Sequence, residues 1–126
     1  MGFLDRIVSQ GMKDVPNAWH PLTSKEQLDT IVEESKAQPV AIFKHSTRCG
    51  ISHNIKYNLE ENWDFEDQDL KFYYLDLLAY RSISNLIAQR FGVVHQSPQV
   101  IVFKDGVPTF STSHHGISVK RLHGAL

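Results

Sequence analysis

The chain has 126 residues, of which 41% are apolar and 21% are charged. This length and composition are typical of one globular domain and exclude a disordered, collagen-like or disulfide-scaffold protein. Thirteen basic and fourteen acidic residues give a net charge of −1, so no overall field attracts nucleic acid or an anionic membrane. Since neither a signal-peptide core nor a membrane-length apolar window is present, we expect a cytoplasmic protein without nucleic-acid or membrane partners.

The first half of the chain predicts an arm, a helix and a buried strand. Residues 1–18 hold only a short apolar run and are expected to form an N-terminal arm of the single domain, residues 1–126. Ser24 and Gln27 have the spacing of a helix start, and apolar residues then recur on one helical face until a stop before Pro39. The continuous apolar run 40–43 predicts a central strand, and residues 19–22 are a possible extra strand.

The second half predicts two further strand and helix pairs and a terminal hairpin. A helix is expected from about residue 50 to 62, a strand over 72–76, and a helix over 83–91 that Gly92 ends. Strands over 99–104 and 107–110 flank the turn dipeptide Asp105-Gly106, and Pro108 places the second of them at a sheet edge. A short helix over 118–126 completes an α/β domain with a mixed sheet flanked by helices.

Cys49 is the only cysteine and is expected between the central strand and the following helix. The unpaired amides and positive dipole of a helix start favour a thiolate there, and Arg48 adds a positive charge. A lone cysteine is otherwise a small buried hydrophobe, but Thr47, Arg48 and Gly50 favour exposure. A single cysteine forms no internal disulfide, so any redox chemistry here is monothiol.

Two neighbours of Cys49 allow more than one interpretation. The Ser52 hydroxyl, three residues on, either donates a hydrogen bond to the sulfur or is simply solvated. His53 could share the face of Cys49, but a Cys/His dyad also needs an orienting group and an oxyanion hole that the sequence does not reveal.

Pro98 lies just before an apolar strand. It suits the first position of that strand, or it forms a cis bond that turns the preceding backbone toward an extended disulfide substrate. The adjacent histidines His114 and His115 would need a third ligand to bind a metal ion, so we expect solvated side chains and no metal site there.

Taken together, these segments resemble the thioredoxin superfamily, and most closely the monothiol bacilliredoxins of the bacillithiol system. The resemblance rests on Lys44-His-Ser-Thr-Arg-Cys49-Gly-Ile-Ser52, on Ser97-Pro98-Gln99 and on the Asp105-Gly106 hairpin, and covers about residues 17–120. It implies a thioredoxin-like fold, a cis Pro98 facing Cys49, and a general-stress or thiol-repair role. It also implies that Cys49 is the redox nucleophile. We expect the catalytic residues to be Cys49 with Arg48 and Ser52, which tune its thiolate, and the substrate-binding residues to be Lys44, Thr47, Gly50, Ser97, Pro98 and Gly116.

The expected activity is removal of a small thiol, bacillithiol or a similar one, from mixed disulfides on client proteins. Arg48 and Lys44 are expected to hold the carboxylates of that small thiol, which is a co-substrate, and no tightly bound cofactor is expected. Gly50 departs from the family, which usually has proline there, and brings the motif close to that of monothiol glutaredoxins. An iron–sulfur carrier of that type and a catalytically inactive stress adaptor therefore remain alternative functions.

Overall fold

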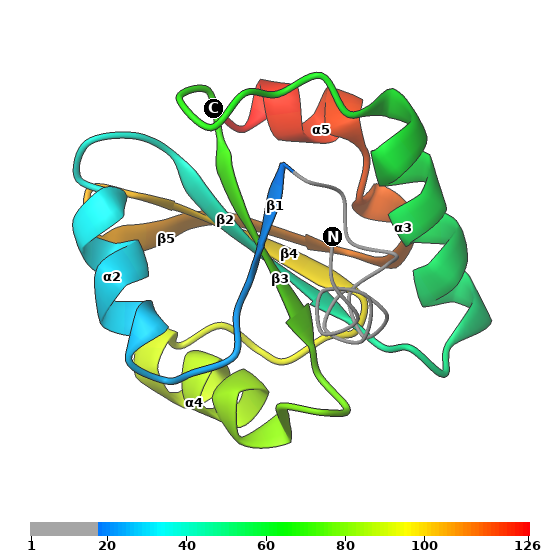
Figure 1. Cartoon of the computed structure of the whole chain (residues 1–126), viewed down its shortest axis with the longest axis horizontal. Helices are drawn as coiled ribbons and strands as arrows, with labels where there is room; N and C mark the ends of the chain where they lie inside the picture. Colours follow the sequence, from blue (N-terminus) through cyan, green and yellow to red (C-terminus); the bar gives the residue numbers. More distant parts are fainter. Residues whose placement is uncertain (1–17) are drawn as a thin grey trace, which may run out of the picture.

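The computed structural model describes residues 18–126, which form one mixed sheet with helices on both faces (Figure 1). Apart from Ala18, the predicted N-terminal arm lies outside the described residues. In chain order the elements are β1 (Trp19–Pro21), α2 (Gln27–Glu34), β2 (Val40–His45), α3 (Gly50–Asn62), β3 (Lys71–Asp76), α4 (Arg81–Phe91), β4 (Gln99–Lys104), β5 (Val107–Ser113), the 3-10 turn η1 (His114–Gly116) and α5 (Val119–Gly124). The predicted α/β class is confirmed, as is the extra strand near residue 20.

The sheet has the strand order β1-β3-β2-β4-β5. The first three of these strands are parallel, while β4 and β5 are antiparallel to their neighbours. Because β2 is central and parallel to β3, the segments that follow β2 and β3 and the segment that precedes β4 all meet at one end of the sheet. That end holds Cys49.

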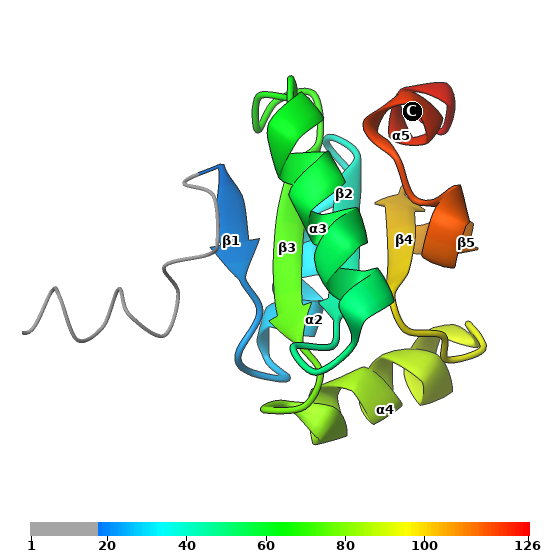
Figure 2. The same cartoon turned by 90° about the vertical axis from the view of Figure 1, so that its right-hand side faces the viewer.

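Alternating side chains of the strands build two cores, one on each face of the sheet. On one face, Ala41 and Phe43 of β2 pack with α3, α5 and the aromatic side chains of β1 and β3. On the other face, Val40 and Ile42 pack with the apolar sides of α2 and α4. Figure 2, seen from the side of α3, shows this helix lying across the sheet over β2 and β3.

The central strand is longer than its apolar run indicates. Lys44 and His45 continue the ladder, since Lys44 pairs with both Leu75 of β3 and Gln99 of β4. Every residue of β2 is buried, these two polar ones included. Sheet pairing on both sides therefore extends the strand beyond the point where its hydrophobicity ends.

The start of α2 differs from the predicted capping arrangement. The helix begins at Gln27 after a turn, and the Ser24 hydroxyl caps no helix amide. Instead Oε1 of Gln27 accepts hydrogen bonds from the amides of Thr23 and Ser24, at 2.8 and 3.0 Å. The glutamine half of the capping pattern is thus formed without the serine half.

The remaining turns agree with the sequence. Gly92 ends α4 with φ 68°, a left-handed conformation that glycine adopts without strain. Asp105 and Gly106 have φ of 53° and 85° in the β4–β5 hairpin, and Pro108 lies on the edge strand β5, as predicted. The hairpin is anchored to the end of α2, because the Asp105 amide donates to the Ser35 carbonyl at 2.8 Å.

Candidate active site

Cys49 lies between the centre of the sheet and the first turn of α3. It is the N-cap residue of α3, with extended backbone angles of φ −105° and ψ 120°, and it is partly exposed. Its amide donates to the Ser46 carbonyl at 3.2 Å, and its own carbonyl accepts from the His53 amide at 3.0 Å. The cysteine is therefore held at the end of a helix where backbone amides stabilise negative charge.

Ser52 points into the protein from the same helical turn. It is fully buried, its Oγ lies 2.6 Å from Nδ1 of His45, and it accepts from the Ser46 amide at 3.2 Å. Within the described residues, no hydrogen bond joins this hydroxyl to Cys49. Ser52 thus fastens the end of β2 to α3, which is neither of the two arrangements that the sequence left open, a hydrogen bond to the sulfur or a solvated hydroxyl.

His45 is a site residue that the sequence reasoning missed. It is 1% exposed and stands at the end of β2, on the face that α3 covers. Its ring packs edge-on against His53, with centroids 5.2 Å apart. Alternation along β2 could have revealed it, because residues 41, 43 and 45 share one face of the strand.

The structure corrects the expectation for Lys44. The alternation that turns His45 toward α3 turns Lys44 to the opposite face of the sheet, where its side chain is fully buried. Nζ of Lys44 donates to the Ser84 carbonyl at 3.3 Å and lies 3.2 Å from Nδ1 of His95. Burial lowers the pKa of Lys44 from 10.5 to about 8. The prediction that Lys44 holds carboxylates of a small thiol is therefore wrong.

The exposed part of the cysteine loop carries one guanidinium. Thr47 and Arg48 are exposed, and Arg48 makes no ion pair within the described part of the chain. His53 bonds through Nε2 to the Thr47 carbonyl at 2.8 Å, which fixes the loop backbone beside Cys49. Arg48 is thus the cation of this loop that is available to an anionic group.

Ser97 and Pro98 lie beside the cysteine loop. The peptide bond between them is cis, as the resemblance implied. Because Lys44 pairs with Gln99, the buried Pro98 lies next to the end of β2, where the loop to Cys49 begins. The Pro98 carbonyl accepts from the His114 amide at 3.1 Å, which joins this segment to η1.

Gly116 is the last residue of η1, and η1 contacts α3, the helix that begins after Cys49. A Cβ atom at this position would collide with Oγ1 of Thr112. A side chain at Gly116 would therefore force either η1 or the Thr112 side chain to shift. By contrast, a Cβ at Gly50 would meet no atom, and glycine is not required there.

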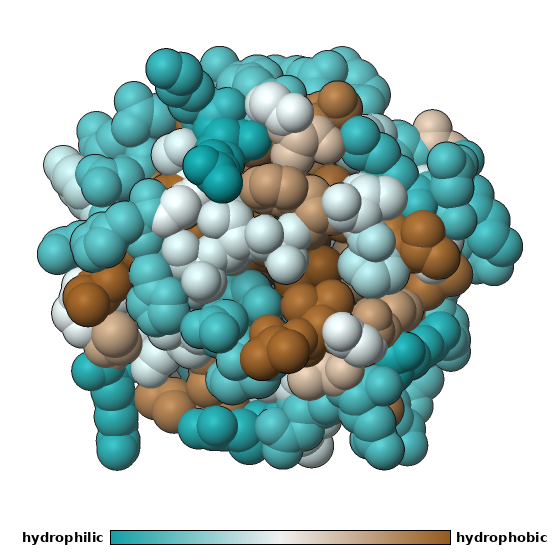
Figure 3. All heavy atoms as spheres, turned by 180° about the vertical axis from the view of Figure 1, so that it is seen from behind, coloured by the Kyte–Doolittle hydropathy of each residue, from teal (hydrophilic) through white to brown (hydrophobic). Residues whose placement is uncertain are grey.

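Exposed apolar side chains surround this end of the sheet. Ile51 follows Cys49, Leu78 follows β3, and Val94 precedes β4, with exposures of 45%, 39% and 77%. The rear view shows a mainly hydrophilic surface on which hydrophobic residues form several separate areas (Figure 3). Apolar contacts are thus available from segments that adjoin the cysteine end of the sheet.

Two hollows adjoin the site. One of about 260 Å³ lies between α3 and β3 and includes Thr47, His53 and Tyr57 in its lining. Another of about 360 Å³ lies between residues 92–99 and the end of β5, and includes Val94, Gln96 and Ser113. The cysteine loop therefore has a recess toward β3, and the segment that carries Pro98 has one toward β5.

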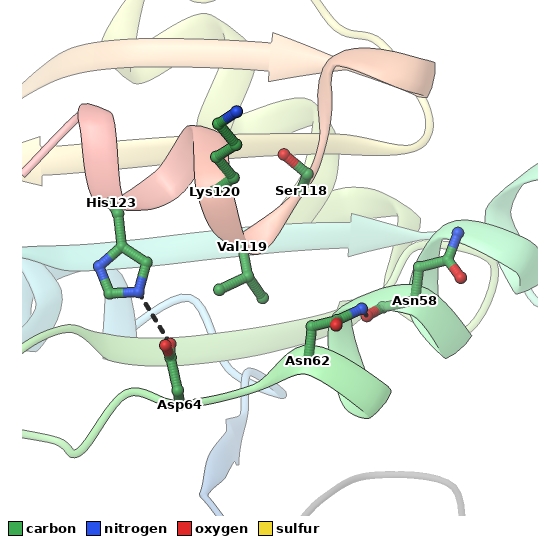
Figure 4. A pocket seen from close by; sticks show the side chains of 7 residues that line it. All are labelled: Asn58, Asn62, Asp64, Ser118, Val119, Lys120 and His123. Atoms are coloured by element: carbon green, nitrogen blue, oxygen red, sulfur yellow. Dashed lines mark hydrogen bonds and ion pairs between the residues drawn. The ribbon is translucent and has the colours of Figure 1, made fainter.

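A third hollow, of about 470 Å³, lies between α3 and α5 (Figure 4). Asp64 and His123 face each other there, with Oδ1 and Nε2 2.8 Å apart. None of the predicted site residues lines it. This groove is separate from the cysteine site.

Among residues 18–126, no group of three or more metal-ligating side chains occurs, and no helix is long and apolar enough to cross a membrane.

The chain matches known proteins over most of its length. The family model described as monothiol bacilliredoxin BrxC matches residues 20–122. A solved thioredoxin-fold protein described as a candidate oxidoreductase shares 32% identity, with 86% of this chain and 93% of that chain covered and a TM-score of 0.70.

Two thioredoxins from other organisms share the fold at lower identity. That of Malassezia sympodialis is 23% identical over 88% of this chain and 90% of its own, with a TM-score of 0.65. That of Fasciola hepatica is 18% identical over 83% and 93%, with a TM-score of 0.64. These two likenesses show the fold, while the family-model match and the 32% identical oxidoreductase, together with a single cysteine at the start of α3, identify a redox protein of the thioredoxin fold. The chain belongs to the monothiol bacilliredoxin BrxC family.

Proposed function

We propose that the protein is a monothiol oxidoreductase that removes bacillithiol, or a similar small thiol, from mixed disulfides on client proteins. The observation that carries this proposal is the position of Cys49, the chain's only cysteine, half-exposed at the N-terminus of α3 beside Ser97 and Pro98. Family membership supports the choice of substrate class.

The exchange needs one nucleophile and no bound cofactor. The Cys49 thiolate attacks the sulfur of the small thiol in the mixed disulfide, so one S–S bond forms as another breaks. The client leaves as a thiolate and takes a proton from water, while the small thiol stays on Cys49. A second small thiol then attacks that adduct and releases Cys49 together with a symmetric small-molecule disulfide.

The surroundings of Cys49 offer room for both halves of the substrate. We assign the client segment to the Ser97 side, where Val94 and Ile51 supply apolar contacts. We assign the small thiol to the opposite side, where Thr47 borders the recess toward β3 and Arg48 can pair with a carboxylate. The activity needs a reduced thiol pool, so we place it in the cytoplasm.

The test is intact-mass spectrometry of the reduced protein after exposure to bacillithiol disulfide, glutathione disulfide and coenzyme A disulfide. We expect a rapid adduct of bacillithiol on the wild type, slower adducts with the other two, and none on the Cys49→Ser variant. A slow or absent adduct with all three disulfides would contradict the proposal. An iron–sulfur carrier, tested by anaerobic cluster reconstitution, or an inactive adaptor would then fit better.

A further inference from the structure

Lys44 is a fully buried lysine whose recorded partners are not carboxylates. Lysine is rarely buried completely unless a charged group pairs with it. Here Nζ is bonded to the Ser84 carbonyl of α4 and lies 3.2 Å from Nδ1 of His95. None of the ion pairs between described residues includes Lys44. Its burial therefore depends on two neutral acceptors.

The contact with His95 requires one protonation state of the imidazole. A lysine ammonium only donates hydrogen bonds, so Nδ1 of His95 must carry a lone pair rather than a proton. The Ser84 hydroxyl also lies 3.3 Å from this nitrogen. Protonation of His95 would remove this acceptor and place a positively charged imidazole against the ammonium group of Lys44.

His95 belongs to the segment 92–98, which leads into the active site. Two side chains hold this segment. Gln99 of β4 donates from Nε2 to the Val94 carbonyl at 2.9 Å and accepts from the Gln96 amide at 3.3 Å, and Lys44 of β2 holds His95. Lys44 and Gln99 are themselves paired across β2 and β4. The segment is thus fastened to the sheet two residues before Ser97.

We propose that Lys44 and His95 are a positioning pair that sets the place of Ser97 and Pro98 beside Cys49, and that they do so only while His95 is neutral. The pair acts through the backbone of the segment 92–98 and does not touch the reacting sulfur atoms. Its role in exchange rests on the function proposed above.

The charges around His95 agree with this arrangement. Lys44 of β2 and Arg81 of α4 face it, while Ser84 of α4 is neutral. The carboxylate at the end of β3, Asp76, is engaged by the amides of Leu78 and Ala79. Although His95 is an exposed residue, partial burial of its imidazole, then the charges of Lys44 and Arg81, lower the pKa of His95, so the imidazole is neutral at physiological pH. We expect the pair to separate as the pH falls through the titration of His95.

Two rates measured at a series of pH values test the proposal. The first is exchange with a bacillithiol mixed disulfide on a purified single-cysteine client, which uses the 92–98 segment. The second is alkylation of Cys49 by iodoacetamide, which depends on the thiolate and not on that segment. Their ratio removes the titration of Cys49 itself from the comparison.

For the wild type, we expect this ratio to fall about fivefold on acidification, the factor that corresponds to loss of one hydrogen bond. His95→Asn provides an amide oxygen at the position of Nδ1 that accepts from Lys44 at every pH, so its ratio should stay high. Lys44→Met lacks the donor, so its ratio should be low throughout. His123→Asn, the same substitution on α5 away from the site, should keep the wild-type decline.

A decline in His95→Asn equal to that of the wild type, or a wild-type ratio that does not depend on pH, would overturn the positioning pair. Failure of the wild type to exchange at any pH, with normal alkylation, would overturn the proposed function instead. In that case an NMR titration still tests the contact. The pKa of His95 should rise in Lys44→Met, and an unchanged value would refute the pair.

Discussion

Replacement of Lys44 by methionine should change how the stability of the protein depends on pH. Methionine has a similar length and fills the same buried space without a charge. Because burial lowers the pKa of Lys44 from 10.5 to about 8, the folded state holds this proton less tightly than the unfolded chain. The variant removes that difference and leaves the other titrating groups in place.

The size of the effect follows from the two pKa values. A difference of one pKa unit corresponds to about 1.4 kcal/mol, so the shift from 10.5 to about 8 costs the wild type about 3 kcal/mol while Lys44 is protonated in both states. The cost is complete below about pH 8, since the folded protein then binds the proton too. Between about pH 8 and 10.5 the unfolded chain binds more protons than the folded protein, so the stability of the wild type rises relative to the variant.

Urea denaturation of both proteins across this pH range measures the difference directly. Near neutral pH the variant should be the more stable of the two proteins. It gains up to about 3 kcal/mol because the buried charge is absent, and it loses about 1 kcal/mol for each hydrogen bond that Lys44 makes. The advantage should shrink by about 3 kcal/mol toward pH 10.5. Curves that stay parallel from neutral to alkaline pH would refute the reasoning, because they would mean that Lys44 is solvated when charged.

Three further changes test the local geometry by urea denaturation. Gly50→Pro should raise the stability by about 0.4–1 kcal/mol, because this is the first position of α3 and the extended backbone of Cys49 suits a residue before proline; a loss of stability would contradict this. Ser52→Ala should cost about 1–3 kcal/mol, since it leaves buried partners unsatisfied, and an unchanged midpoint would show that the hydroxyl is not bonded as described. Gly116→Ala should cost about 1–3 kcal/mol, and Thr112→Ala should restore most of that loss in the double variant. Equal losses in the single and double variants would show that the close approach to Thr112 is not the cause.

Local patterns were sufficient to predict the order of elements. The apolar run 40–43 predicts a strand covered on both faces. The hairpin follows from Asp105 and Gly106, because its turn requires positive φ values at these two residues. Cys49 between a strand and a helix follows from the same patterns. These features depend on a few neighbouring residues, so the chain encodes them before any long-range contact is made.

The burial and the hydrogen-bond partners of individual polar side chains could not be found in this way. Lys44 and His45 are adjacent in the sequence and equally polar, yet the strand continues through them and sends them to opposite faces of the sheet. Whether a polar residue at a strand end is exposed or buried depends on how far β3 and β4 extend beside it. That is a property of the assembled sheet.

The sequence by itself determined the α/β domain, the position of Cys49 at the start of a helix and the monothiol character of the site, because spacing and composition suffice for these. Only the tertiary structure decided that Ser52 binds His45 and that Lys44 meets His95, which lies 51 positions further along the chain. The physical reason is that hydrogen bonds between distant residues form only after the sheet has brought their strands and loops together.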